Sequence, residues 1–151
     1  MSAEEEVPVR ISKLLEAKGA DVATITPDES VANAVSGMAR LRIGALVVSG
    51  DGSRIDGIVS ERDIVRALVG DDGSLLARPV SSIMTATVHT CSPDDDTDGL
   101  MATMTDRRIR HVPVVEGGRL AGIVSIGDVV KTRIGELEHD RNQLVDYINA
   151  R

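Results

Sequence analysis

The sequence predicts an α/β (α+β) fold built from two similar β-α-β-β-α repeats and a C-terminal helix. The first observation is a duplicated motif, because GIVSERD at residues 57–63 returns as GIVSIGD at 122–128. The second is that residues 25–28 match 91–94 at an offset of 66, which falls to 65 at the motif. The third is size, since a unit of about 60 residues buries too little apolar surface to be stable alone. We therefore expect the two copies to form one folding unit.

The first half shows a local signal for each expected element. Ser30 fits the N-cap of a helix, because apolar residues follow it at i, i+3, i+4 and i+7 spacing. Gly50-Asp51-Gly52-Ser53 is a turn signal between two apolar runs, which favours an antiparallel hairpin. The expected elements are a helix at 9–17 ending near Gly19, a strand at 22–26 stopped by Pro27, the helix after Ser30, strands at 45–49 and 55–59, and a helix from 60 to about 69.

The second half repeats this order after a linker at residues 71–79. The expected elements are a strand at 88–91, a helix with Thr97, Leu100, Met101 and Met104 on one face, strands at 112–115 and 120–124 around a turn at 116–118, and a helix from 125.

The C-terminal residues carry a heptad pattern. Ile134, Leu137, Leu144 and Ile148 fit a and d positions, with Arg141 at an a position. Two heptads indicate a helix that packs on something, and two alternatives stay open with equal weight: a second subunit, or an exposed edge of the chain's own core. The expected units are residues 9–70, 80–133 and a helical extension at 134–151.

Composition excludes several classes of function. There is no Phe or Trp and only one Tyr, so the core is aliphatic and recognition by aromatic stacking is disfavoured. The net charge of -7 argues against a nucleic-acid or anionic-membrane partner. One cysteine leaves no intramolecular disulfide and no cysteine-rich metal site. With no apolar signal core and no run of 18 apolar residues, we expect a soluble, cytoplasmic protein.

Two readings fit the Ser-x-x-Asp part of the motif. Ser60 with Asp63, and Ser125 with Asp128, have the spacing of a capping box at a helix start. The same groups suit a ligand, because a helix start offers N–H groups to phosphate and a carboxylate accepts from ribose hydroxyls. The spacing alone leaves both readings open.

The element order, the Thr-x-Pro after the first strand and the two Gly-x-x-Ser-x-x-Asp motifs resemble the CBS domain. Two copies over residues 9–133 resemble a tandem pair, the Bateman module, of the stand-alone bacterial type. The resemblance implies repeats related by a pseudo-two-fold axis and a regulatory module with no catalytic residues and no required cofactor. Its ligand would be AMP or another adenosyl compound (ADP, ATP, NAD or S-adenosylmethionine), and its partners a second copy of the chain and an effector protein.

The resemblance also implies two unequal clefts. In the cleft expected to be primary, Ile123, Ser125 and Asp128 face Ala20, Ile43 and Gly44, with Arg110 and His111 at the phosphate. A nucleotide-binding member of the family has a His–Arg pair there, in the reverse order. In the secondary cleft, Ile58, Ser60 and Asp63 face Ala86, Ile109 and Arg110, and Arg62 supplies charge.

The remaining residues support weaker alternatives. Arg107 and Arg108 fit a solvated helix end, where cations complement the helix dipole. The acidic residues at 94–98 fit a helix N-terminus better than a calcium loop. A constitutive dimeric scaffold whose motifs only cap helices is the alternative to a ligand sensor. An enzyme that uses His111 and Cys91 is a remote third.

Overall fold

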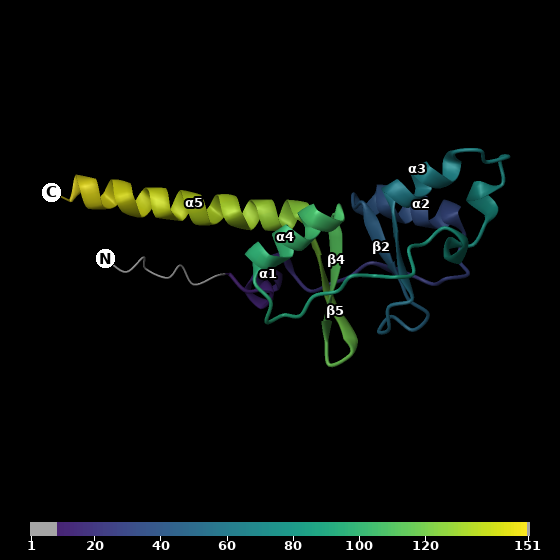
Figure 1. Ribbon diagram of the computed structural model, residues 1–151, viewed down its shortest axis with the longest axis horizontal. Coiled ribbons are helices and arrows are strands. Elements are labelled where there is room, and N and C mark those ends of the chain that lie inside the picture. The colour runs from purple at the N-terminus through teal and green to yellow at the C-terminus, as the bar shows by residue number, and fades with distance from the viewer. Residues whose placement is uncertain (1–8, 151) are drawn as a thin grey trace.

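The computed structural model describes residues 9–150 and shows two α/β repeats that lie side by side along the long axis of the molecule (Figure 1). The helices are α1 (Ile11–Lys18), α2 (Val31–Leu41), α3 (Glu61–Leu68), α4 (Thr97–Arg107) and α5 (Ile126–Asn149), with short 3-10 helices η1 (Leu75–Ala77) and η2 (Val80–Ser82). The strands are β1 (Thr24–Ile25), β2 (Ala45–Val48), β3 (Gly57–Ser60), β4 (His111–Glu116) and β5 (Arg119–Ser125). The predicted mixed fold with a C-terminal helix is confirmed.

The two antiparallel hairpins have equivalent registers. Ala45 pairs with Ser60 in the β2–β3 hairpin, and His111 pairs with Ser125 in the β4–β5 hairpin. In each repeat the hairpin leads from the end of one helix to the start of another. The serine that ends each hairpin is therefore also the N-cap of the next helix.

The first strand of the second repeat was predicted at 88–91, and this prediction is wrong. Only Cys91 forms a bridge there, parallel to Val114, whereas β1 of the first repeat pairs with β2 over two residues. The cause is Pro113. In the first repeat the Val47 N–H donates to the Ala23 carbonyl at 3.2 Å. Pro113 stands at the position equivalent to Val47 and has no N–H to donate, so the second ladder is shorter.

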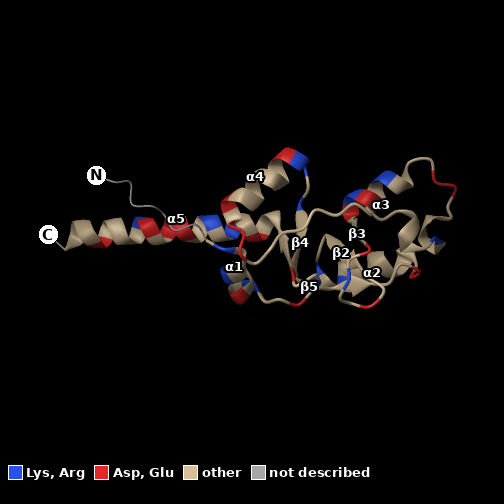
Figure 2. Cartoon of the chain, turned by 60° about the horizontal axis from the view of Figure 1, so that its bottom comes forward, with Lys and Arg blue, Asp and Glu red and all other residues tan. Residues whose placement is uncertain are grey.

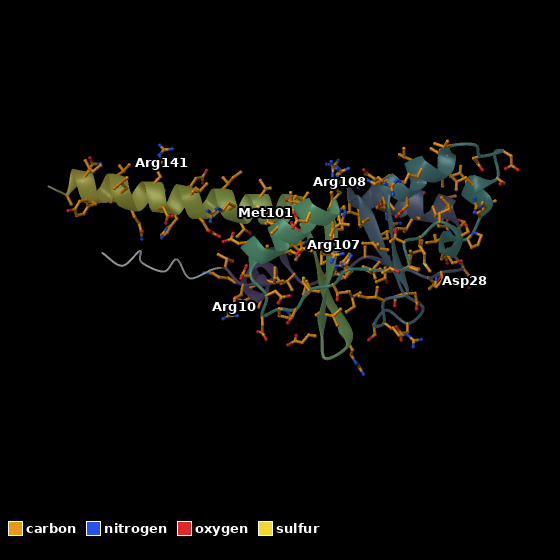
Figure 3. All side chains as sticks on the ribbon, in the orientation of Figure 1. Arg10, Asp28, Met101, Arg107, Arg108 and Arg141 are labelled. Carbon is orange, nitrogen blue, oxygen red and sulfur yellow. The ribbon has the colours of Figure 1, made fainter. Side chains whose placement is uncertain are left out.

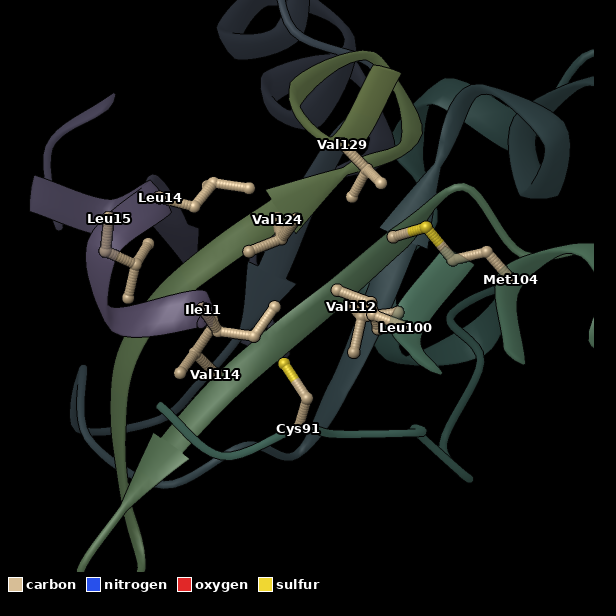
Figure 4. Close-up of a cluster of buried hydrophobic side chains, with 10 residues drawn as sticks. All are labelled: Ile11, Leu14, Leu15, Cys91, Leu100, Met104, Val112, Val114, Val124 and Val129. Atoms are coloured by element: carbon tan, nitrogen blue, oxygen red, sulfur yellow. The ribbon is translucent and has the colours of Figure 1, made fainter. Parts of the chain in front are cut away.

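The hydrophobic core of the second repeat contains residues from the opposite end of the chain. Ile11, Leu14 and Leu15 of α1 are buried beside Val114 and Val124 of the β4–β5 hairpin (Figure 4). Backbone hydrogen bonds fix this arrangement, because residues 11 and 12 donate to the carbonyls of residues 95 and 93 at 2.8 and 2.9 Å. Residues 9–17, which the sequence assigns to the first unit, thus contribute Ile11, Leu14 and Leu15 to the core of the second repeat.

The first repeat is completed in the same way by residues of the linker. Val80 of η2 is buried in its core, and Ile83 and Met84 pack against that core. The N–H of Val31, at the start of α2, donates to the carbonyl of residue 78 at 2.9 Å. We call residues 9–18 and 78–84 the completing segments. Each precedes one repeat in the sequence and closes the core of the other.

The glycines of the duplicated motif make room for the completing segments. A Cβ added at Gly57 would lie 2.7 Å from Met84 Sδ and 2.9 Å from the carbonyl oxygen of Thr85. A Cβ added at Gly122 would lie 2.9 Å from a methyl group of Leu15. All three distances are shorter than van der Waals contact, which explains why the motif begins with glycine in both copies.

Helix α5 continues without interruption past residue 134, where we had expected a separate extension to begin, and its distal half projects beyond the rest of the molecule (Figure 1). Arg151 lies outside the described residues. Large apolar side chains are exposed along the helix, and they are Val130, Ile134, Leu137, Leu144, Val145, Tyr147 and Ile148. Charged residues are concentrated in the part of α5 nearer the fold, and the distal part is mostly uncharged (Figure 2). An apolar helix surface of this length favours the subunit-contact alternative.

We expect Gly57→Ala to lower the free energy of unfolding by about 1–3 kcal/mol, because the added methyl group would overlap a backbone carbonyl that cannot turn aside. Gly122→Ala should cost less, because the Leu15 side chain can shift. Urea denaturation would measure both. Gly135→Ala is the control, since a Cβ at that helical position meets nothing within 4 Å and should stabilise by about 0.5–1 kcal/mol. Equal losses for Gly57→Ala and Gly122→Ala would refute the backbone contact as the cause.

We expect a homodimer in which α5 takes part. Light scattering at micromolar concentration should give about twice the chain mass of 16.0 kDa. Replacing both Leu144 and Ile148 by glutamate should give the monomer mass, because the charges would have to be buried in the contact. Gln143→Glu, on the same helix, should leave the dimer intact. A monomer mass for the unaltered protein would contradict the expectation.

Candidate ligand-binding clefts

Both Ser-x-x-Asp motifs form complete capping boxes. Ser60 Oγ accepts from the Asp63 N–H at 3.3 Å, and Asp63 Oδ2 accepts from the Ser60 N–H at 2.9 Å. The corresponding distances for Ser125 and Asp128 are 3.2 and 2.8 Å. The capping reading is therefore correct in both repeats. It leaves room for a ligand, because a carboxylate has about four acceptor sites and the capping bond uses only one.

A cavity of about 450 Å³ lies at the first of these helix starts, between the two repeats. This volume is within the range of small-molecule sites. Eight of the residues expected from the sequence line it, and they are Gly44, Ile58, Ser60, Arg62, Asp63, Ile109, Arg110 and His111. The remaining lining residues are Glu61, Arg66, Thr85, Arg107 and Arg108. Two of the eight, Gly44 and His111, are predicted from the sequence for the Asp128 cleft alone, and Arg110 is predicted for both clefts.

Five arginines line this cavity against only two carboxylates, those of Glu61 and Asp63. Arg62 Nη1 donates to the Arg108 carbonyl at 2.8 Å and so joins α3 to the end of α4. Figure 3 shows Arg107 and Arg108 at the end of α4 that lies toward the first repeat. Within residues 9–150, no hydrogen bond or ion pair holds the guanidinium groups of Arg66, Arg108 and Arg110. Their charge is available to an anion, on a protein whose net charge is -7.

The carboxylate of Asp63 faces the cavity with neutral partners. Asp63 Oδ1 accepts from the hydroxyl of Thr85 at 3.0 Å, and Oδ2 accepts from the hydroxyl of Ser60 at 3.0 Å. Thr85 also pairs with Ile58 through two backbone hydrogen bonds of 2.9 Å. The completing segment at 78–84 thus leads directly into the cavity wall. Ala86, which follows, is exposed and is not among the lining residues.

The second helix start has a different partner. The ammonium group of Lys18, at the end of α1, forms an ion pair with Asp128 Oδ2 and donates to the Ile123 carbonyl at 2.6 Å. Burial of Asp128 would raise the pKa of its carboxyl group, but hydrogen bonds from Lys18 and Ser125 outweigh burial and hold the pKa below the ordinary 3.8. Of the other residues expected here, Ile43 packs against the core of the first repeat and Ala20 is exposed.

His111 lies between the two helix starts. Its ring packs against Gly44, where an added Cβ would lie 3.3 Å from His111 Cε1. Burial lowers the pKa of His111 below the ordinary 6.5, and the positive charges of Lys18 and Arg110 act in the same direction. The negative charges of Glu61 and Asp128 oppose this shift. His111 is therefore neutral at pH 7.

The lone cysteine does not form a reactive site. Cys91 is buried in the core of the second repeat, and burial raises the pKa of its thiol to about 12. The thiol therefore stays protonated and unreactive at neutral pH. Residues 9–150 contain no group of three or more His, Cys, Asp or Glu side chains that could hold a metal ion. Among the described helices, none has the length and apolar character needed to cross a bilayer.

Sequence reasoning missed four residues of these two sites, Lys18, Glu61, Arg66 and Thr85. It also assigned Arg107 and Arg108 to a solvated helix end, whereas both line the cavity. One signal was present: the 66-residue offset aligns Lys18 with Met84, immediately before Thr85. Both residues therefore could have been placed beside a motif, but only after the completing segments were known to cross between repeats.

Comparison with known proteins agrees with this architecture. The sequence profile of the CBS domain matches residues 17–70 and 80–135. The chain thus belongs to the CBS domain family and contains two such domains in tandem.

Three relatives show the range of similarity. The crystal structure of the CBS-domain containing protein ATU1752 from Agrobacterium tumefaciens is 48% identical, with a TM-score of 0.80 over 83% of this chain and 99% of that one. The CBS domain-containing protein CBSX3, mitochondrial, of Arabidopsis thaliana is 36% identical over 148 residues, covering 93% of this chain and 72% of the relative. The CBS domain pair of protein MJ0100, solved in complex with 5′-methylthioadenosine and S-adenosyl-L-methionine, is 24% identical with a TM-score of 0.75, over 85% of this chain and 98% of that one.

We expect the free energy of unfolding to fall as the pH is lowered through the usual range of histidine. The unfolded chain binds a proton at His111 near pH 6.5, whereas the folded protein binds it only at lower pH, so protonation favours unfolding. The stability that the neutral His111 side chain contributes is fully present above pH 6.5 and declines as the pH falls below that value. Urea denaturation at several pH values would show the decline, and His111→Gln should make it shallower. An unchanged pH dependence in His111→Gln would contradict the buried, neutral imidazole.

Proposed function

We propose that this chain is a non-catalytic regulatory module that binds a phosphate-bearing adenosyl ligand in the cavity at Asp63. One observation carries the proposal: a cavity of about 450 Å³ combines a carboxylate at a helix start with five arginines. Hydrogen bonds from Ser60 and Thr85 use three of about four acceptor sites of the Asp63 carboxylate, which leaves one site for a ribose hydroxyl, the group that a carboxylate binds in dinucleotide-binding folds. The arginines offer planar donors that suit phosphate oxygens.

This proposal reverses the order of the clefts that we expected from the sequence. The sequence ranks the Asp128 cleft first because it assigns the Arg110–His111 pair to that cleft, and only Arg110 of the pair to the cleft of Asp63. Both residues line the cavity at Asp63, together with Arg107 and Arg108, which belong to the second repeat. In this proposal the arginines of the second repeat bind the phosphate, and the Asp63 carboxylate of the first repeat binds the ribose.

The charge of the cavity favours some adenosyl compounds over others. The arginines favour AMP, ADP, ATP or NAD, whose phosphates are anionic. They disfavour S-adenosyl-L-methionine, whose sulfonium group is cationic, although that compound is bound by the CBS domain pair of MJ0100. We expect affinity to rise with the number of phosphates, since among residues 9–150 no side chain pairs with the guanidinium groups of Arg66, Arg108 and Arg110 at the cavity.

Binding would act as a signal because the ligand touches both repeats. A ligand that contacts Ser60 and Asp63 on one side and Arg107, Arg108 and Arg110 on the other would bias the angle between the repeats. We expect the readout to be an effector protein, and the compartment to be the cytoplasm.

Calorimetric titration with ATP, AMP, adenosine and S-adenosylmethionine tests the proposal. ATP should bind most tightly. Arg110→Gln should lower the affinity for ATP by roughly tenfold to a hundredfold, which is the effect of losing a charged hydrogen bond. It should change the affinity for adenosine little, because adenosine has no phosphate. Arg119→Gln, at an exposed position on β5, is the matched control and should leave both affinities unchanged.

A second variant tests the ribose contact. Asp63→Asn should lower the affinities for ATP and for adenosine by similar factors, because both compounds carry the ribose. Thermal unfolding must be measured beside it, because Asp63 also caps α3. If none of the four compounds binds, the proposal fails and the alternative of a constitutive scaffold, for which the exposed apolar side of α5 provides a surface, replaces it.

A further inference from the structure

At the start of α5, Lys18 takes the place beside Asp128 that Thr85 takes beside Asp63 in the cavity of the first repeat. In the Asp63 cavity, the Thr85 N–H donates to the Ile58 carbonyl, and the Thr85 hydroxyl donates to the Asp63 carboxylate. In the Asp128 cleft, the equivalent carbonyl belongs to Ile123. A single ammonium group, that of Lys18, donates both to this carbonyl and to the Asp128 carboxylate. The carbonyl and carboxylate at Asp63 therefore accept from a neutral residue, Thr85, whereas those at Asp128 accept from a charged one, Lys18.

The difference in charge between the two donors matters for a ligand. Thr85 is neutral, so the Asp63 carboxylate keeps its negative charge toward the cavity. Lys18 neutralises Asp128 and holds the pKa of that carboxyl down through a charged hydrogen bond. A ribose hydroxyl is a neutral donor, and it would have to displace an ammonium group to reach the same oxygen atoms.

The position of Lys18 is fixed by the fold. It is the last residue of α1, and Gly19 ends the helix with a positive φ of 100°. The same helix buries Ile11, Leu14 and Leu15 in the core of the second repeat, whose β5 leads to Asp128. The packing of α1 thus holds the Lys18 ammonium group beside Asp128. The Lys18 side chain is 28% exposed.

We propose that Lys18 is a built-in occupant of the Asp128 cleft, which restricts this two-domain chain to one nucleotide site. The proposal rests on the proposed function for the cavity at Asp63. Ligand binding at Asp128 requires the lysine to leave first, so this cleft fills only at much higher ligand concentration or not at all. Lys18 is therefore a specificity-determining residue that sets the number of sites.

The test is the number of ATP molecules bound per chain, measured by calorimetric titration of the full chain. The unaltered protein should bind one, and Lys18→Met should bind two, because methionine keeps the length of the lysine side chain but cannot donate to Asp128 or neutralise it. Lys13→Met removes the same charge from an exposed position on the same helix and should still bind one. Lys18→Gln serves as a second variant if the methionine protein does not fold.

The outcomes separate this inference from the proposed function. Two sites in the unaltered protein, or one site in both Lys18 variants, would overturn the role of Lys18 while leaving nucleotide binding intact. If the unaltered protein binds no ATP, the proposed function is overturned instead. If a single site then appears in the Lys18 variants, the inference that Lys18 blocks ligand binding at Asp128 is still supported.

A measurement without ligand checks the contact itself. The charge of Lys18 lowers the pKa of His111, so NMR titration of the His111 ring should show a higher pKa in Lys18→Met than in Lys13→Met. Glu61, Asp128 and Arg110 also act on this ring and are unchanged in both variants. An identical His111 pKa in the two variants would show that Lys18 does not lie in the cleft in solution, and the inference would fall.

Discussion

The crossing of the completing segments is the constraint on which the rest of the structure depends. Neither repeat has a full core of its own, because α1 closes the second repeat and residues 78–84 close the first. These segments also bring Lys18 to Asp128 and Thr85 to Asp63. The packing that makes the two repeats one folding unit therefore also places Thr85 in the wall of the Asp63 cavity and the Lys18 ammonium group beside Asp128.

The capping boxes link this packing to function. A helix that starts directly after a hairpin leaves its first N–H groups and its N3 carboxylate at the end of the strands, where the repeats meet. The same atoms that stabilise α3 are exposed to a ligand at the cavity. A stabilising role and a binding role for Ser60 and Asp63 are therefore compatible, and which one a substitution reveals depends on whether stability or affinity is measured.

Much of the fold could be predicted because the signals were local. The turn at 50–53, the cap at Ser30 and the duplicated motif each lie within one element, and the hairpins and helices formed where expected. Two failures have non-local causes. The short strand before Cys91 is lost because Pro113, on another strand, lacks a donor. Lys18 was missed because it reaches Asp128 from 110 positions away, and no local pattern marks such a contact.

The close approach of Leu15 to Gly122 limits how independently the two copies can change in evolution. A duplicated gene begins with identical halves, and each half would ordinarily be free to change by itself. Here a larger side chain at position 122 requires Leu15, which is encoded before the first repeat, to shift or to become smaller. The copies differ at surface and site positions such as Gly127 and Arg62, but residues that meet across the crossing constrain one another, so a change in one half alters the packing of the other.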